Sequence, residues 1–389
     1  MAYQSALQFG LKKLFVGNRG QMLVISFDGV KFTITGRYVI RDWLPSWMLF
    51  KEPNFLYAIN PLADDTDLFQ LGPDLSSKAP IKRADGTFSW TKQFLDKPTF
   101  VSSSKGSRGG VHLEFNADKT RMVETSFFSS KIDIWDISAA NGSLRLMKSL
   151  SITGNPSPGR KHHRPHQAVL DPTGRFFVVP NLTADTLLII DAKDDRYEIT
   201  NIAPVPTGVG PRHVAFLTRE GTHYLVMVAE FTNELFLFEA AYVGDTILLT
   251  QIQRQSTYGG MHPRETSKVA EVEVARNQRD VYVSNRITGD ETDHVAHFAF
   301  SRKDGGAARL DYVSRVSSGG LQPRSFCLSS DAEQQFVFVA NETGKYGLVA
   351  LQRDPETGVL DPNPVAKMSN KELDAPGQSG QGPHFVCEI

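Results

Sequence analysis

Short apolar runs alternate with turn residues along most of this chain, and the clearest example is the segment Arg164–Asp191. An apolar run, HQAVLD, is followed by a Pro-Thr-Gly turn, a β-rich run over 175–180, a polar corner and a third run over 187–190. Strands of about four to six residues separated by Pro, Gly, Asn and Asp are typical of an antiparallel meander. The pattern therefore predicts three consecutive antiparallel strands.

The same pattern recurs along the chain. Further copies begin near Gly110, Gly210, Lys268 and Gln322, and a degenerate copy begins near Pro45. The last residues, GPHFVCEI, resemble a first strand alone, whereas the N-terminal KLFVGNRGQMLVISF resembles a second and third strand with no first. Joining the two ends completes one more repeat.

The seven copies predict an all-β, seven-bladed β-propeller whose closing blade combines N-terminal strands with the C-terminal strand. Closure of this kind removes the unpaired edges of an open sheet. We expect one domain over 1–389; an elongated sandwich or two β-domains are the alternatives. Fourth strands are expected at Ser143–Ile152, Tyr197–Pro204, Ile247–Gln253, Leu310–Val316 and Leu360–Met368.

Two rings of side chains follow from this alignment, because the first strand of a blade begins, and the second ends, on the same face of the propeller. The first ring consists of Ser46, Val111, His166, Arg212, Ala270, Arg324 and His384. The second ring, just beyond the second strands, consists of Arg19, Pro61, Phe127, Leu182, Glu230, Arg286 and Glu342. We expect both rings to surround the mouth of the central channel.

The rings combine four arginines and two histidines with two glutamates. Arginine recognises carboxylate or phosphate through paired hydrogen bonds, and histidine can transfer a proton near neutral pH. Glutamate can act as a base or hold an arginine in place. This excess of positive charge favours a site for an anionic ligand; the alternative is a network of ion pairs that only fills the channel.

Composition narrows the function classes. The formal net charge of -1 and the pI near 6.8 give no general attraction to nucleic acid or anionic membranes. The sequence has no apolar run long enough to span a bilayer, and its N-terminal residues lack the pattern of a signal peptide. Cys327 and Cys387 have no metal-type spacing. We expect a cytoplasmic, soluble monomer without a metal site or an obligate protein partner.

Other motifs add less. His262 lies in the segment GGMHPRETS, which should enter the same face as the rings and could reach a ligand; a solvated loop is the alternative. His162 and His163 lack further metal ligands that we can place. The chain has no G-x-S-x-G nucleophile motif and no Gly-rich phosphate loop.

Several of these motifs resemble the lactonase family of seven-bladed propellers. They include PHQAVLDPTGRFFVVPN, GPRHVAF, VAEFTNEL, VYVSNR and QPRSFCLSSDAEQQFVFVAN, so the resemblance is good from about Gly110 onward and poor before it. The family includes 6-phosphogluconolactonases and fungal 3-carboxy-cis,cis-muconate lactonizing enzymes. The resemblance implies a catalytic group of His166, Arg212, Glu230 and Arg286.

Two enzymatic hypotheses follow from the resemblance and the rings. The first is a cofactor-independent cycloisomerase, an intramolecular lyase of the carboxymuconate type that closes a γ-lactone. In it, Arg212 and Arg286 would hold carboxylates and His166 would move a proton, with Glu230 orienting the group. The second is a lactone hydrolase of the 6-phosphogluconolactonase type. Arg19, Arg324, Glu342, His384 and His262 are the expected substrate-binding residues in either case.

Two further hypotheses remain open from the sequence. A propeller of this kind could be a binding platform that has apolar and aromatic hot spots on its rim. It could also be a diverged cyclase of secondary metabolism. The expected partner in the enzymatic hypotheses is a small anionic carboxylate or lactone.

Overall fold

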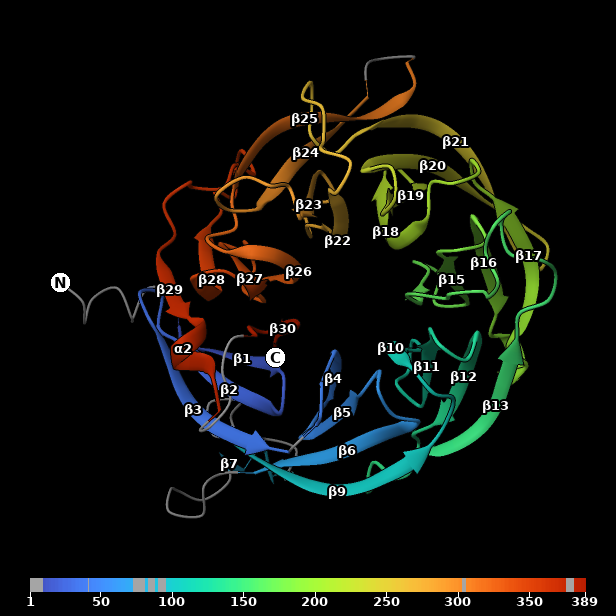
Figure 1. The fold of residues 1–389 in the computed structure, drawn as a ribbon. Coiled ribbons are helices and arrows are strands. Elements are labelled where there is room, and N and C mark those ends of the chain that lie inside the picture. Colours follow the sequence, from blue (N-terminus) through green and yellow to red (C-terminus); the bar gives the residue numbers. More distant parts are fainter. Residues whose placement is uncertain are drawn as a thin grey trace.

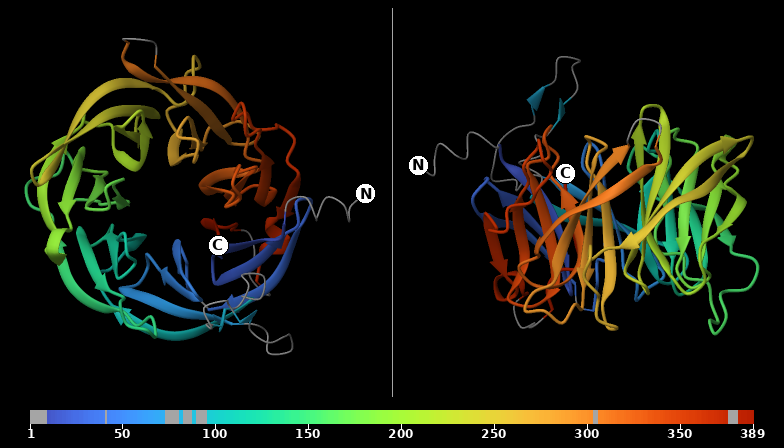
Figure 2. Two further views of the ribbon diagram at one scale, coloured as in Figure 1. Left: turned by 180° about the vertical axis from the view of Figure 1, so that it is seen from behind. Right: turned by 90° about the horizontal axis from the view of Figure 1, so that it is seen from above.

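The computed structural model describes residues 10–40, 42–72, 81–82, 88–89, 96–302, 306–375 and 381–389. In this part of the chain, seven four-stranded antiparallel sheets form a ring around a central channel, and one two-stranded hairpin is added (Figure 1). Seen from the side, the ring is a short cylinder (Figure 2). The predicted seven-bladed all-β propeller is confirmed.

Each blade has four strands that run from the channel to the rim. The innermost strands are β30 (Phe385–Glu388), β4 (Trp47–Lys51), β10 (Gly110–Phe115), β14 (Val169–Leu170), β18 (Pro211–Arg219), β22 (Lys268–Val274) and β26 (Leu321–Leu328). The second strands are β1 (Lys12–Asn18), β5 (Phe55–Ile59), β11 (Arg121–Ser126), β15 (Phe176–Asn181), β19 (Thr222–Ala229), β23 (Asp280–Arg286) and β27 (Phe336–Thr343).

The outer half of each blade supplies the rim. The third strands are β2 (Gln21–Phe27), β6 (Asp65–Gly72), β12 (Lys131–Asp136), β16 (Thr186–Asp191), β20 (Glu234–Val243), β24 (His294–Arg302) and β28 (Tyr346–Gln352). The outermost strands are β3 (Phe32–Val39), β9 (Lys97–Lys105), β13 (Arg145–Ser151), β17 (Glu198–Pro204), β21 (Thr246–Ser256), β25 (Ala308–Ser317) and β29 (Ala366–Ser369). The hairpin β7 (Ile81–Lys82) and β8 (Phe88–Ser89) lies between β6 and β9 in the sequence.

Helix is confined to short segments in the described ranges. These are the 3-10 turn η2 (Lys193–Asp195) and the single turn α2 (Asn370–Leu373). A capping box at Ser369 and Glu372 begins α2. Within the described ranges, no helix is long and apolar enough to cross a membrane.

The closing blade joins the two ends of the chain as predicted. Its strand order is β3-β2-β1-β30, so the C-terminal strand is innermost and pairs with β1. Gly17 lies opposite Phe385 in this pairing, and the carbonyl of Gly17 accepts a hydrogen bond from the backbone N–H of His384 at 2.8 Å. The N-terminal strands therefore fix the start of the innermost C-terminal strand.

The hydrophobic core lies between neighbouring sheets, and strand alternation divides it. On β1, Leu14 packs in a cluster with Phe338 of the preceding blade, whereas the adjacent Phe15 packs with Leu56 of the following blade. Successive side chains of a strand point to opposite faces, so one strand of alternating large apolar residues stabilises two blade interfaces.

Four of the inner strands carry a bulge near the channel mouth. The pairing register shifts at Val111 in β10, at Arg212 in β18, at Ala270 in β22 and at Arg324 in β26. All four are members of the first predicted ring. A bulge leaves a residue outside the ladder and redirects side chains, so consecutive residues of one strand can both face the channel.

Candidate functional site

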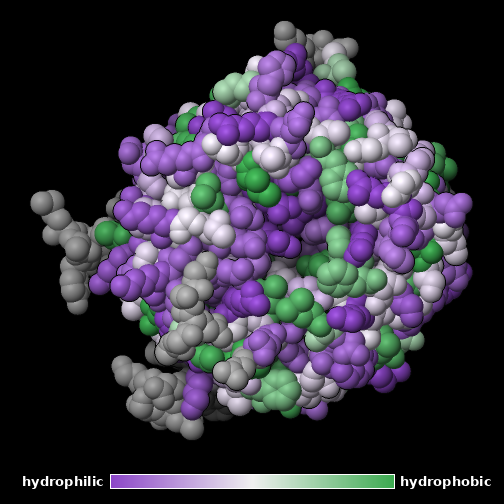
Figure 3. Space-filling view, in the orientation of Figure 1, coloured by the Kyte–Doolittle hydropathy of each residue, from purple (hydrophilic) through white to green (hydrophobic). Residues whose placement is uncertain are grey.

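Two adjoining cavities open at the channel mouth. The larger, of about 230 Å³, is lined by Pro61, Leu62, Val111, Phe127, Phe128, His166, Leu182, Arg212, Glu230, Arg286 and Arg324. The smaller, of about 90 Å³, shares His166, Arg212 and Arg324 with it and is completed by residues that include Ser46, Trp47, His213 and His384. Figure 3 shows this face hollowed near its centre, with hydrophilic residues on one side of the hollow and hydrophobic residues on the other.

Glu230 pairs with two arginines that line the larger cavity together with it. Its carboxylate lies 3.0 Å from Nε of Arg212 and 3.1 Å from Nη2 of Arg286. Arg212 is almost fully buried, and its Nη1 also donates a hydrogen bond to the carbonyl of Ala270 at 2.5 Å. Burial lowers the pKa of Arg212 to about 9, and the charge of Glu230 opposes this shift. Two cations against one anion leave positive charge facing the cavity.

His166 stands in this cationic surrounding as a buried histidine. Its backbone N–H donates to the carbonyl of Pro180 at 3.0 Å, which fixes it just before β14. Burial, and then the charges of Arg212 and the other cations, hold the pKa of His166 well below its ordinary value. The imidazole is therefore neutral at pH 7. Its Nδ1 contacts Nε2 of His213 at 3.2 Å, which leaves Nε2 of His166 for the cavity.

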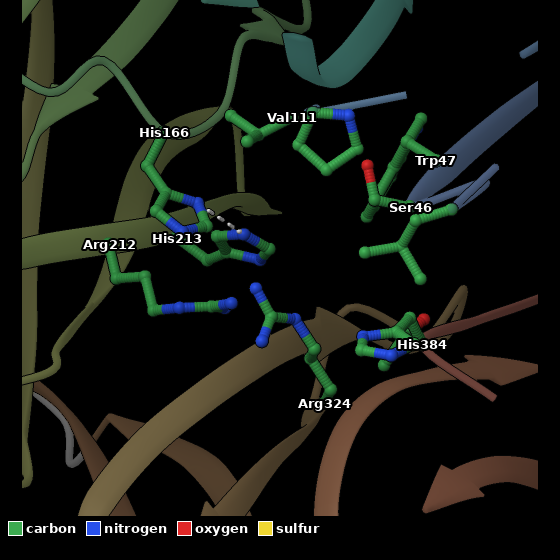
Figure 4. Close-up of a pocket in the computed structure, with 11 residues that line it drawn as sticks. Ser46, Trp47, Val111, His166, Arg212, His213, Arg324 and His384 are labelled. Atoms are coloured by element: carbon green, nitrogen blue, oxygen red, sulfur yellow. Dashed lines mark hydrogen bonds between the residues drawn. The ribbon is translucent and has the colours of Figure 1, made fainter. Parts of the chain in front are cut away.

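A second group of charges lies at the smaller cavity. Nη1 of Arg324 is 3.5 Å from Oε2 of Glu342, and the same oxygen is 3.9 Å from Nδ1 of His384. Burial lowers the pKa of His384 to about 4, against the effect of Glu342. Figure 4 shows the guanidinium of Arg324 pointing into the space between Arg212 and His384. Arg324 is thus the least enclosed of the three arginines and the most able to contact a ligand.

The opposite wall is apolar. Phe127, Phe128 and Leu182 line it, and the guanidinium of Arg164 lies over the Phe127 ring at 4.3 Å. Nη1 of Arg164 also donates to the backbone carbonyl of Phe127 at 3.3 Å. The cavity therefore has one face for a carbon skeleton and one for negative charge.

The structure brings together most of the residues predicted from the rings. His166, Arg212, Glu230, Arg286 and Arg324 line one cavity, His384 lines the adjoining one, and Glu342 contacts Arg324 and His384 behind it. Two others lie apart. Arg19 is exposed and donates to the side chain of Gln381 at 2.9 Å, and His262 is exposed on its loop and lines neither cavity. A substrate-binding role for these two stays a prediction without support from the geometry.

Two functional candidates were missed at the sequence level. His213 lies beside Arg212 in the GPRH motif, and its Nδ1 is 2.5 Å from Oε1 of Glu271. Strict alternation would direct His213 away from the ring residue Arg212. The bulge in β18 removes that alternation, and a second bulge in β22 does the same for Glu271. The sequence does carry a signal for both residues, because His213 directly follows the ring residue Arg212 and Glu271 directly follows the ring residue Ala270.

Among the residues that the structure describes, no group of three or more His, Cys, Asp or Glu side chains could hold a metal ion. Cys327 and Cys387 are free thiols on β26 and β30. Burial raises the pKa of both thiols, so neither is a thiolate at neutral pH.

Comparison with known proteins agrees with the observed fold. Residues 17–371 match the family model described as "Lactonase, 7-bladed beta-propeller". The chain is 25% identical over 364 residues to a probable 6-phosphogluconolactonase of Arthroderma benhamiae, an alignment that covers 90% of this chain and 84% of the relative. It is 27% identical over 292 residues to the 6-phosphogluconolactonase of Bacillus subtilis, covering 72% of this chain and 78% of the relative.

Solved structures show the same fold. The periplasmic gluconolactonase PpgL of Pseudomonas aeruginosa superposes with a TM-score of 0.72 at 19% identity, covering 98% of this chain and 99% of that one. A putative 6-phosphogluconolactonase of Bacteroides fragilis gives a TM-score of 0.70 at 16% identity, covering 93% and 98%. The match of the family model over nearly the whole propeller shows that the chain belongs to the lactonase family of seven-bladed β-propellers.

Proposed function

We propose that this protein is a lactone hydrolase of the 6-phosphogluconolactonase type, with its active site at the channel mouth. The observation that carries the proposal is a neutral, buried His166 that shares a cavity with the guanidinium groups of Arg212, Arg286 and Arg324. A base beside fixed positive charge is what attack of water on a lactone carbonyl requires.

The reaction passes through a tetrahedral oxyanion. His166 accepts the proton of the attacking water through Nε2, while Arg212 stabilises the negative charge that develops on the carbonyl oxygen. Arg212 is already fixed by Glu230 and by the carbonyl of Ala270, so it needs no reorganisation as the charge forms. His166 then returns the proton to the ring oxygen as the carbon–oxygen bond breaks.

An anionic substituent on the substrate fits the remaining charge. Arg324 is about one-third exposed, and among the described residues its side chain has only a long contact with Glu342, so its donors are available to a ligand. Arginine is well suited to phosphate because its fork of N–H groups matches the phosphate oxygens. We assign Arg324 to a phosphate or carboxylate group of the substrate, with the apolar wall at Phe127 and Leu182 against its carbon atoms.

The relatives favour hydrolysis over the cycloisomerase hypothesis. The sequence motifs favour lactone formation from an unsaturated carboxylate of the carboxymuconate type, and the same arginines and histidine would serve that reaction. The relatives reported above, however, are named as lactonases, and none of them is named as a lactonizing enzyme. The comparisons therefore support the second of our two enzymatic hypotheses.

The experiment is a direct comparison of substrates with the purified full chain. Acid release is followed by pH-stat titration with 6-phosphogluconolactone and with unphosphorylated gluconolactone, and the diene absorbance of 3-carboxy-cis,cis-muconate is followed in parallel. We expect enzymatic hydrolysis well above the spontaneous rate, fastest with the phosphorylated lactone. Loss of the diene absorbance without lactone hydrolysis would replace the proposal with the cycloisomerase.

A further inference from the structure

A continuous string of side chains leads from the cavity into the propeller. Nδ1 of His166 contacts Nε2 of His213 at 3.2 Å, and Nδ1 of His213 contacts Oε1 of Glu271 at 2.5 Å. Figure 4 shows the two imidazole rings joined beside Arg212. All three members are almost fully buried. His166 lines both cavities and His213 lines the smaller one, whereas Glu271 lines neither.

We propose that His213 and Glu271 are positioning residues that form, with His166, a buried proton relay. Through this relay His166 accepts a proton from the attacking water and returns it to the leaving oxygen without becoming an imidazolium. The inference rests on the proposed function for the reaction that it serves, and it concerns residues outside the predicted catalytic group.

The surroundings of His166 explain why a relay is needed. An imidazolium there would lie among three guanidinium groups in a buried site, where repulsion is weakly screened. The same holds for His213, whose pKa is lowered well below its ordinary value by burial and then by Arg212. The charged and titratable groups that face the two rings are Arg212, Arg286, Arg324, Glu230 and His112. A proton taken up by either ring alone would be strongly opposed.

Glu271 is a more favourable proton acceptor than either imidazole ring. Burial raises its pKa to about 8, and its Oε2 is buried without a hydrogen-bond partner among the described residues. Its Oε1 accepts a hydrogen bond from the backbone N–H of Val272 at 3.1 Å as well as facing His213. A carboxylate that is this poorly solvated gains stability when a proton reaches it.

The transfer balances as follows. In the resting base form, Glu271 is a carboxylate and both rings carry their proton on Nδ1, so the string has a charge of minus one. As the water oxygen bonds to the lactone carbon, Nε2 of His166 takes the water proton, Nδ1 of His166 passes its proton to His213, and His213 passes its own to Glu271. The string is then neutral. When the bond to the ring oxygen breaks, each proton moves back and the oxygen leaves as a hydroxyl group.

The test uses ¹⁵N-histidine NMR of the full chain, which reports ring tautomers whether or not a substrate is known. We expect His166 and His213 to change together from protonation on Nε2 to protonation on Nδ1 as the pH rises through about 8. Glu271→Gln should abolish this change. Glu273→Gln is the matched control, because Glu273 is a partly buried glutamate of the same strand whose pKa is also raised to about 8. Its carboxylate accepts a hydrogen bond from the Leu328 backbone and not from His213. It should leave both tautomer changes intact.

Kinetics of the same variants test whether the relay contributes to lactone hydrolysis. In Glu271→Gln we expect kcat to fall about 100-fold with KM changed less than about threefold. In Glu271→Gln, the rise of kcat with pH should occur at lower pH than in the wild type. In Glu273→Gln, it should occur at the same pH as in the wild type.

Two results would overturn the relay even if the protein hydrolyses lactones. One is a stable imidazolium on His213 between about pH 6 and pH 9, and the other is independent tautomer changes of the two histidines in the wild type. If the two tautomers change together in a protein that has no lactonase activity, the proposed function is wrong but the relay is not contradicted. The wild-type spectra alone show whether the two tautomers change together. They therefore test the relay even if Glu271→Gln does not fold.

Discussion

Nε of Arg212 lies 3.0 Å from Oε2 of Glu230; Arg212 is on the innermost strand β18, and Glu230 directly follows the second strand β19 of the same blade. The other carboxylate oxygen of Glu230 is 3.1 Å from Arg286 of the next blade. Glu230 therefore ties two blades together at the point where the ligand charge would be bound. Removing one arginine lowers the positive charge of the cavity and leaves Glu230 paired with the other arginine.

Arg212→Gln should lower kcat/KM for the preferred lactone by at least about 100-fold, because the donor that faces the developing oxyanion is lost. The measurement is steady-state kinetics at pH 7, together with thermal unfolding to confirm the fold.

Arg254→Gln is the matched control for this variant. Arg254 makes a two-point pair with Glu234, at 2.8 Å for each bond, in the same blade but on its outer strands. Its loss should leave kcat/KM within about twofold of the wild type, since exposed pairs contribute about 1 kcal/mol or less to stability. Equal activity of the two variants would remove Arg212 from the mechanism.

Arg324→Ala should separate the two lactone substrates. We expect KM for 6-phosphogluconolactone to rise about 10- to 100-fold, since a charge-assisted contact to phosphate is lost. KM for unphosphorylated gluconolactone should change less than about threefold, which makes the second substrate an internal control. Equal losses with both substrates would show that Arg324 does not select the phosphate.

Gly17→Ala should destabilise the closure of the ring. A Cβ at this position would collide with the carbonyl oxygen of Pro45 and touch Cβ of Phe385, and a backbone obstacle cannot move as a flexible side chain can. We expect a loss of about 1–3 kcal/mol in the free energy of unfolding. Gly72→Ala, also on a strand but with no atom of the described residues within 4 Å of the added Cβ, should cost little. Denaturant unfolding of both variants measures the difference.

Glu124→Gln should alter the pH dependence of stability. Glu124 is buried and accepts hydrogen bonds from Thr66 at 2.6 Å and from Trp135 at 2.9 Å, and burial raises its pKa to about 8. Between its ordinary pKa and this value, the folded state keeps a proton that the unfolded state has lost. Stability from this group is therefore full at low pH and falls by up to about 1.4 kcal/mol per pH unit as pH rises toward 8.

The glutamine variant keeps an acceptor for both donors but cannot ionise. The stability of the wild type relative to Glu124→Gln should thus decline between about pH 5 and pH 8 and level off above that range. Glu356→Gln, on an exposed turn, serves as the control and should track the wild type throughout. A constant difference between wild type and Glu124→Gln would show that Glu124 is ionised in the folded protein at all these pH values.

Much of the propeller could be predicted because each blade repeats the same signals. The alternation along the strands and the split repeat at the ends fixed the number of blades and the closing arrangement. The fourth strand expected at Leu360–Met368 was placed too early. The observed strand, β29, begins at Ala366, and Leu360 makes only an isolated bridge with Arg353. Pro362 and Pro364 lack the backbone N–H that a strand would donate there.

The ring residues of the site could be predicted because the strand pattern that predicts the blades also locates where each inner strand starts. Counting strands located the ring residues His166, Arg212 and Arg324, because a strand start needs no knowledge of side-chain direction. The role of His213 and Glu271 depends on bulges that break the two-residue alternation, and a bulge leaves little trace in a single sequence. The positions of Arg19 and His262 could not be predicted because both lie in turns or loops, where ring counting does not fix the direction of a side chain.

The most direct test of the proposed function is kcat/KM for 6-phosphogluconolactone at pH 7, measured with the wild type and with His166→Gln. Glutamine keeps a polar side chain of similar length but cannot accept the water proton as imidazole does. We predict that kcat/KM falls by about 100-fold or more while thermal unfolding stays close to that of the wild type. Hydrolysis by His166→Gln within about threefold of the wild-type rate would contradict the assignment of this histidine and of the channel mouth as the catalytic site.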